Sequence, residues 1–227
     1  MKEALKHGSC CENTYRDLQL VLKPVANTMK MIASCILLAV CTTLVASHHF
    51  HTNRCLPAMG KYPFDDQKFS GDWYVVSRAF RPDEFGPLKC DKVHYSAELV
   101  GNLTRSTMDI HVKQEDGTEQ HWMGKGQAML PGYSSTTSMA WKNSDIDQWH
   151  SVARHAVLAT DYDSYALIHA CLERYDGSTD DFSKVVFNMI WSRTAALDAA
   201  MLKTLKSIMS SFDLEDDDWY DVPNTDC

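Results

Sequence analysis

Cysteine and histidine are the residues of this chain with the most specific chemistry. The eight cysteines could form disulfides, bind a metal or supply a nucleophilic thiolate, and the ten histidines could act as ligands or bases. No Ser/His/Asp arrangement, pair of carboxylates or glycine-rich phosphate loop accompanies them. We therefore predict that the protein is not an enzyme.

Composition narrows the class further. The chain has 227 residues, 44% of them hydrophobic, and 22 basic against 30 acidic residues give a formal charge of -8. Binding to nucleic acid needs many basic side chains on one face, and this acidic chain has no basic cluster, so we predict no nucleic-acid partner. Eight cysteines in a chain of this size indicate an oxidising compartment.

An apolar run at residues 31–46 supplies a route to that compartment. It follows Lys30 and precedes Ser47, with the charge, length and small-residue ending of a secretory signal peptide. A membrane span needs roughly 20 strongly apolar residues, and this run is shorter. We predict a signal peptide over residues 29–47, cleaved after Ser47 or after Ala46, and a secreted, extracellular protein without a membrane span.

The rest of the chain divides around this segment. Residues 1–28 show no motif or sustained periodicity; they are either a gene-model artefact or the cytosolic stub of a signal anchor, and we favour the artefact. We expect one domain over residues 48–227, because no linker, repeat or low-complexity segment marks a second. Four cysteines in an oxidising lumen form two disulfides with three possible pairings. The cysteines that this domain retains are Cys55, Cys90, Cys171 and Cys227.

Alternating apolar and polar residues predict an all-β domain. Gly101-Asn102 and Asp116-Gly117 are two-residue hairpin signals, so the strands that they join are antiparallel neighbours. Eight such strands close into an up-and-down antiparallel β-barrel that has no free edge. We place the strands at about residues 71–80, 90–100, 103–114, 119–129, 136–142, 148–160, 164–174 and 183–192.

A helix follows the strands. Leu197, Met201, Leu205 and Ile208 have helical spacing and Thr194 is a plausible N-cap, so we expect one amphipathic helix to pack outside the barrel. The acidic tail over residues 213–226 is expected to be solvated, with Cys227 as its anchor.

Three local patterns in this order resemble the signature regions of the lipocalins. The first strand opens with Gly71 and Trp73, a loop contains Thr160, Asp161 and Tyr162, and the last strand closes at Arg193. The stretch around Cys55 is similar to the triabin-like and nitrophorin-like salivary lipocalins of blood-feeding bugs. The stretch over residues 165–171 is similar to the nitrophorins and to the apolipoprotein D and insect bilin-binding group.

The resemblance implies a lipocalin calyx and the pairings Cys55–Cys171 and Cys90–Cys227. Packing considerations give the signature residues a structural role: Trp73 would fill the closed end, and Arg193 could lie across its indole as a cation–π pair. We assign Gly71, Thr160, Asp161, Tyr162 and Arg193 to this structural role with Trp73.

An eight-stranded barrel has room for one small ligand, and every second residue lines the interior. If Trp73 points inward, Val75 and Ser77 point inward as well. If Cys171 points outward, then Ala166, Ile168 and Ala170 on the same strand point inward. The candidate ligand-binding residues are Val75, Ser77, Tyr95, Trp122, Trp141, Ala166, Ile168, Ala170, Phe187 and Met189.

The resemblance to nitrophorins makes haem a candidate ligand, because those proteins bind the haem iron through a proximal histidine on a middle strand. His111 or His121 would occupy that position, whereas the parity of its strand turns His169 outward. No motif isolates either residue, so we predict no metal site, no certain cofactor, and a hydrophobic ligand or pigment ahead of haem.

These observations favour a secreted carrier or scavenger of a small hydrophobic molecule, such as a lipid, bilin, retinoid or biogenic amine. The alternatives are a triabin-like salivary inhibitor that acts on a host protease or platelets through its surface, and a haem-binding nitrophorin-like protein. Asn102 begins a glycosylation sequon in the predicted hairpin turn, and we expect it to be modified.

Overall fold

The computed structural model describes residues 54–79, 87–128, 135–145, 148–149, 152–212, 214, 218–225 and 227. The predicted signal peptide and residues 1–28 lie outside the described residues, so both stay predictions.

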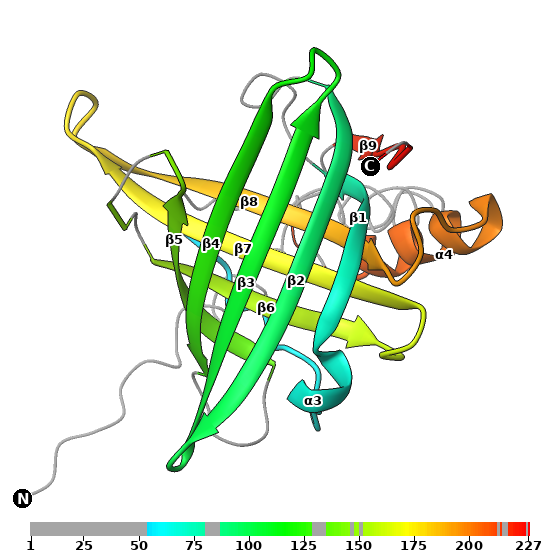
Figure 1. Cartoon of the computed structure of the whole chain (residues 1–227). Coiled ribbons are helices and arrows are strands. Elements are labelled where there is room, and N and C mark those ends of the chain that lie inside the picture. The colour runs from blue at the N-terminus through cyan, green and yellow to red at the C-terminus, as the bar shows by residue number, and fades with distance from the viewer. Residues whose placement is uncertain are drawn as a thin grey trace, which may run out of the picture. The chain divides into compact units, whose positions relative to one another are not determined.

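An antiparallel β-barrel makes up most of the described chain (Figure 1). Its strands lie close to the predicted ranges, and the largest difference is at β6, which starts at Val152 rather than near residue 148. The strands are β1 (Gly71–Ala79), β2 (Leu88–Val100), β3 (Leu103–Gln114), β4 (Glu119–Ala128), β5 (Thr136–Asn143), β6 (Val152–Thr160), β7 (Tyr165–Asp176) and β8 (Asp181–Ser192).

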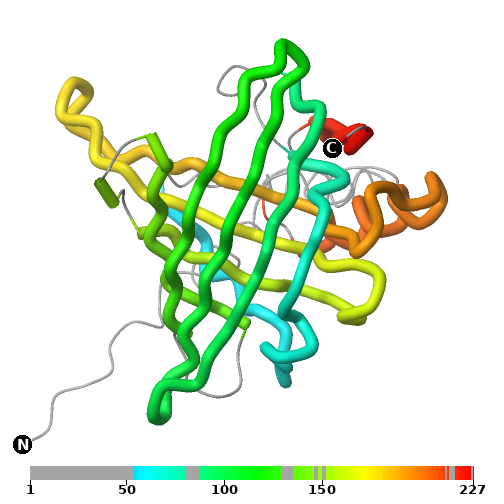
Figure 2. The backbone as a smooth tube through the Cα atoms, viewed as in Figure 1, coloured from blue at the N-terminus to red at the C-terminus, as the bar shows by residue number. Residues whose placement is uncertain are grey.

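Strands β2 to β8 pair with their sequence neighbours, and β1 closes the barrel by pairing with both β2 and β8. The tube in Figure 2 shows the strands winding around a common interior. Both predicted tight hairpin connections are present, and Gly101 (φ 65°) and Gly117 (φ 88°) adopt the positive φ angles that such turns require. The all-β barrel prediction is therefore confirmed.

The C-terminal tail joins the barrel instead of extending into solvent, which corrects the sequence-based expectation. Strand β9 (Trp219–Asp221) pairs with the end of β1, at Ser77–Ala79, beyond the point where β1 stops pairing with β2. Asn224 fills the gap between those two strands: its amide donates to the Val75 carbonyl at 2.9 Å, and its oxygen accepts from the Asp91 N–H at 2.9 Å. The tail thus completes the pairing that β1 and β2 lack.

Helix α4 (Ala199–Ser210) packs outside the barrel, as expected (Figure 1). Its N-cap is Asp198, whose carboxylate accepts from two backbone N–H groups, so the assignment of Thr194 as the cap was wrong. The Thr194 hydroxyl instead donates to the Ala196 carbonyl within the turn that precedes the helix. The helix buries Leu205 and Met209 in a cluster with outward residues of the barrel, namely Val76, Ala156, Leu158, Leu167 and Ile190.

Candidate ligand-binding site

A cavity of about 340 Å³ opens into the barrel between the inward-facing side chains of its strands. Its walls are mainly apolar, as small-molecule sites usually are. Gly124 of β4 leaves space for a wall residue, because a Cβ atom there would lie 2.8 Å from Cζ3 of Trp141. Six of the ten predicted ligand-binding residues line this cavity: Val75, Trp122, Trp141, Ala170, Phe187 and Met189.

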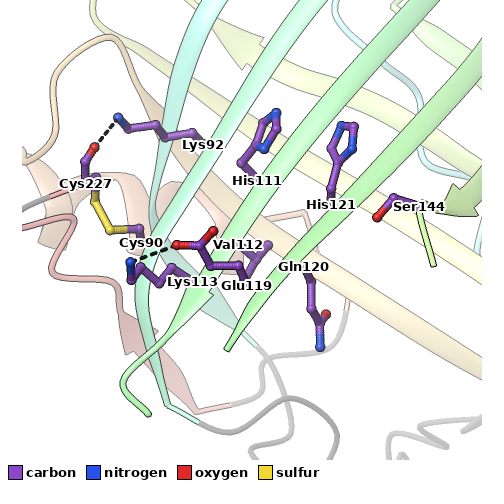
Figure 3. Close-up of a pocket in the computed structure, with 10 residues that line it drawn as sticks. All are labelled: Cys90, Lys92, His111, Val112, Lys113, Glu119, Gln120, His121, Ser144 and Cys227. Atoms are coloured by element: carbon purple, nitrogen blue, oxygen red, sulfur yellow. Dashed lines mark hydrogen bonds and ion pairs between the residues drawn. A yellow bond between two sulfur atoms is a disulfide. The ribbon is translucent and has the colours of Figure 1, made fainter. Parts of the chain in front are cut away.

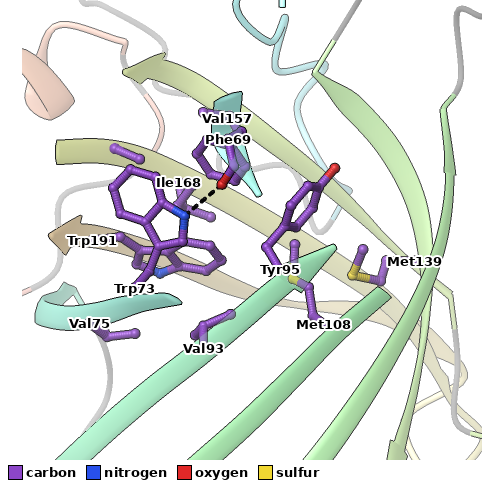
Figure 4. Packing of buried hydrophobic residues seen from close by; sticks show 11 residues of the cluster. Phe69, Trp73, Val75, Val93, Tyr95, Met108, Met139, Val157, Ile168 and Trp191 are labelled. Atoms are coloured by element: carbon purple, nitrogen blue, oxygen red, sulfur yellow. Dashed lines mark hydrogen bonds between the residues drawn. The ribbon is translucent and has the colours of Figure 1, made fainter. Parts of the chain in front are cut away.

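Three further candidates point into the barrel but belong to its packed core. Tyr95, Ala166 and Ile168 are buried with Trp73 and Trp191 in one apolar cluster (Figure 4). Strand alternation predicted the correct face for them, but it could not predict at which height the core ends and the cavity begins.

Ser77 is a wrong assignment. A β-bulge between Val75 and Ser77 shifts the register of β1 against β8, and an inserted residue reverses the alternation beyond it. The Ser77 hydroxyl bonds to the Asp221 carboxylate of the tail at 2.6 Å, while the next residue, Arg78, lines the cavity.

The aromatic side chains of Phe69, Trp73 and Trp191 form a cluster, called the aromatic plug below, that fills the closed end of the barrel. The short helix α3 (Asp66–Phe69) brings Phe69 to 4.9 Å from Trp73, measured between ring centroids, and the Trp73 indole donates to the Phe69 carbonyl at 2.9 Å (Figure 4). The Tyr95 hydroxyl donates to Asp66 at 2.9 Å, which ties β2 to the same helix. Sequence reasoning missed α3, which is a single turn of four residues.

Arg193 covers this plug from outside. Its Cζ lies 3.7 Å from the centroid of the Trp73 ring, which is the cation–π contact predicted from the sequence. The guanidinium also donates to the carbonyls of Lys68, Phe69, Ser70, Asp72 and Tyr162. Arg193 therefore joins α3, β1 and the loop before β7.

The Thr160–Tyr162 signature loop is held by local hydrogen bonds. Partial burial opposes the charged form of Asp161, but hydrogen bonds from the Ser164 hydroxyl and from the N–H groups of Tyr165, Ser164 and Asp163 outweigh it and lower the pKa of this carboxyl. Tyr162 adopts a positive φ of 73° and accepts an N–H bond from Asp65 on its hydroxyl at 3.1 Å. These contacts agree with the structural role that we assigned to the loop.

Polar groups interrupt the apolar wall at few positions. His155 is buried beside Trp191, and burial, assisted by His169, lowers its pKa to about 3, so the imidazole is neutral at physiological pH. Arg78 forms an ion pair with the fully buried Asp91, and burial raises the pKa of Asp91 to about 6 although Arg78 opposes that shift. Arg174 is exposed and lines the cavity from β7.

Comparison with known proteins identifies the family. Rabbit (Oryctolagus cuniculus) apolipoprotein D is 30% identical over 122 residues, which cover 54% of this chain and 59% of the relative. Rat (Rattus norvegicus) apolipoprotein D is 25% identical over 173 residues, covering 76% and 84%. Insecticyanin from the tobacco hornworm Manduca sexta shares the fold, with a TM-score of 0.54, 19% identity and coverage of 74% and 85%. The chain belongs to the lipocalin family.

No protein-family model matches this lipocalin. The resemblance to the apolipoprotein D group is confirmed by these relatives, whereas the resemblance to triabin-like and nitrophorin-like salivary proteins stays a prediction. The chain spans about 59% of the length of the rabbit relative that it matches.

The two histidines considered for haem lie on the outer face of the lipocalin barrel. Their neighbours Ile110, Val112, Gln120 and Trp122 line the cavity, so strand alternation turns both imidazoles outward. His111 and His121 stack on each other with ring centroids 4.3 Å apart, in a surface hollow that they share with Lys92 (Figure 3). Neither can bind a molecule inside the calyx, and the assignment of a haem position to them was wrong. His169 faces outward as predicted and is buried against Asn188.

Both disulfides of this lipocalin have the pairings that the resemblance implied. Cys55–Cys171 ties the N-terminal arm to β7, and Cys90–Cys227 ties the tail to β2. All four cysteines of the described chain are therefore oxidised. Within that part of the chain, no cluster of three or more metal-ligating side chains occurs, and no helix is both long and apolar enough to cross a membrane.

Sequence reasoning missed four polar residues that line the cavity: Arg78, Gln120, His155 and Arg174. His155 was not singled out, because no motif distinguished it from the other histidines, and Arg78 was hidden by the bulge after Val75. Arg174 is in phase with the correctly predicted Ala170, four residues earlier on β7, so extending that alternation would have found it.

Proposed function

We propose that this lipocalin is a secreted carrier that binds and sequesters a small hydrophobic molecule in its calyx. The cavity carries the proposal: it combines aromatic and aliphatic walls, including Trp122, Trp141 and Phe187, with an opening at one end of the barrel. Apolar surface of this kind gains free energy when a ligand displaces water from it. The closed aromatic end and the two disulfides support a rigid container of this type.

The relatives support the same function without defining the ligand. They are named apolipoprotein D, and the structural neighbour is insecticyanin. Secretion rests on the predicted signal peptide and is supported by the disulfides, which form in oxidising compartments. The surface-inhibitor alternative and the glycosylation of Asn102 stay predictions, although the position of Asn102 in the exposed β2–β3 turn suits an acceptor.

A cavity-filling substitution tests the proposal. We expect the purified protein to bind the uncharged fluorescent probe N-phenyl-1-naphthylamine, and Ala170→Phe to weaken binding about tenfold or more because the new ring occupies the site. Ala140→Phe is the matched control: Ala140 alternates with the inward Met139 and Trp141 on β5, so the same ring is added outside the barrel. Equal binding by both variants, or no binding by the wild type, contradicts the carrier function.

A further inference from the structure

The charges along the cavity wall run against the composition of the chain. Acidic residues outnumber basic ones by 30 to 22 overall. Among the described residues that line the cavity, however, Arg78 and Arg174 are the charged side chains, and no Asp or Glu joins them. His155 adds no charge, because burial lowers its pKa to about 3. The charged side chains that line the cavity are therefore both basic.

Both arginines lie toward the open end. Strands β1 and β7 start beside the aromatic plug and run toward the mouth, and each arginine is close to the last residue of its strand, Ala79 or Asp176. The apolar wall lies deeper, where Val75, Met189 and Trp191 meet the plug. A ligand whose tail enters first would keep a polar head near the arginines and near water.

The two guanidinium groups differ in how much of their charge is free. Arg174 is exposed, and its guanidinium makes no ion pair or hydrogen bond with any described residue. Arg78 is paired with Asp91, which is fully buried and does not line the cavity. An anion at the mouth would thus find one unpaired guanidinium and compete with Asp91 for the second.

We propose that the ligand is an amphiphile with one carboxylate, whose apolar tail fills the calyx and whose head is held at the mouth by the positive charges of Arg174 and Arg78. This inference rests on the proposed carrier function and narrows its ligand class. Guanidinium groups suit carboxylates because they donate parallel hydrogen bonds to both oxygens. An amine, which the sequence left open, would face the unpaired positive charge of Arg174 and no carboxylate on the wall.

The test compares three probes with the same tail and different heads: decanoate, decanol and decylammonium. Each displaces N-phenyl-1-naphthylamine at about pH 7.5, where the acid is ionised and the amine is protonated. The quantity compared is the ratio of decanoate affinity to decanol affinity, because the shared tail contributes equally to both. We expect Arg174→Gln to lower this ratio about three- to fivefold, the size typical of a partly exposed charge pair.

Asp91→Asn acts in the opposite direction. It keeps the shape of the side chain but removes the charge that competes for Arg78, so we expect the ratio to rise about threefold or more. A gain of affinity cannot arise from partial unfolding, which makes this variant the more decisive of the two. Arg154→Gln is the control, because this substitution removes the same charge at a residue that does not line the cavity. Arg154 lies on the outer face of β6, between the inward-facing Ala153 and His155.

The outcomes separate the two proposals. An unchanged ratio in both Arg174→Gln and Asp91→Asn, an equal change in Arg154→Gln, or tightest binding of decylammonium overturns the carboxylate inference while the carrier function stands. If no probe and no reporter binds to the wild type, the carrier function fails as well. A ratio that falls as salt is added, because salt screens the exposed arginine, supports the inference.

Discussion

The buried imidazole of His155 makes the stability of this lipocalin depend on pH in a way that one substitution can isolate. His155 is 2% exposed and lies with its ring centroid 6.1 Å from that of Trp191. Burial, reinforced by the positive charge that His169 can carry, lowers its pKa from the ordinary 6.5 to about 3. The unfolded chain therefore takes up a proton near pH 6.5, whereas the folded protein does not until the pH is far lower.

The sign follows from proton uptake. Because the unfolded state binds more protons between these two values, the free energy of unfolding falls as the pH falls through this window. With 1.36 kcal/mol for each unit of pKa, His155 should remove about 2 kcal/mol between about pH 7.5 and 5, and about 3 kcal/mol by about pH 4. Asp91 acts in the opposite sense, since its pKa is raised, but it is present in both proteins and cancels in a comparison.

The assay is urea unfolding of ligand-free wild type and His155→Phe across this pH range, followed by circular dichroism. The difference between their free energies of unfolding should move by about 2 kcal/mol from about pH 7.5 to 5, with the variant gaining relative to the wild type. Met189→Leu, a change of similar volume in the same cavity, should keep the wild-type pH dependence. A constant difference between wild type and His155→Phe would show that the imidazole is not held neutral by burial.

Three further substitutions test how the ends of the chain are fixed. Asn224→Ala should lower the free energy of unfolding by about 2–3 kcal/mol, because it leaves the Val75 carbonyl and the Asp91 N–H without their partner. Urea unfolding measures this loss, and a cost below about 0.5 kcal/mol would contradict it. Arg193→Met should cost about 3 kcal/mol by removing the charge-assisted bonds to several carbonyls, and a circular dichroism melt near that of the wild type would refute the role of Arg193 in the plug. Replacing Cys90 and Cys227 together by serine should remove about 4 kcal/mol, measured by urea unfolding without reductant so that Cys55–Cys171 stays intact, and a loss below about 1 kcal/mol would contradict it.

Local sequence patterns were enough to predict the barrel and most of the cavity wall. Period-two alternation and glycine-containing turns are local properties, so the eight strands and their neighbours could be predicted without any knowledge of packing. The same alternation placed Val75 and Ala170 on the cavity wall, and Trp141 and Phe187 were candidates because of their aromatic rings. The Trp73–Arg193 contact was also predicted from the sequence. Both residues belong to signature patterns expected at the closed end of the barrel, and a guanidinium beside an indole favours a cation–π contact.

Two features could be seen only in the folded structure: where the strand alternation is interrupted, and which polar residues line the cavity. A single bulge in β1 turned Ser77 outward and Arg78 inward, and bulges depend on how two strands pair rather than on residue type. The tail became a strand because β1 and β2 diverge and leave backbone groups that Asn224 can bond. Three features depend on side chains that come together from distant strands, so no local pattern predicts them. They are the height at which the packed core ends and the cavity begins, the burial of His155, and the two arginines at the mouth.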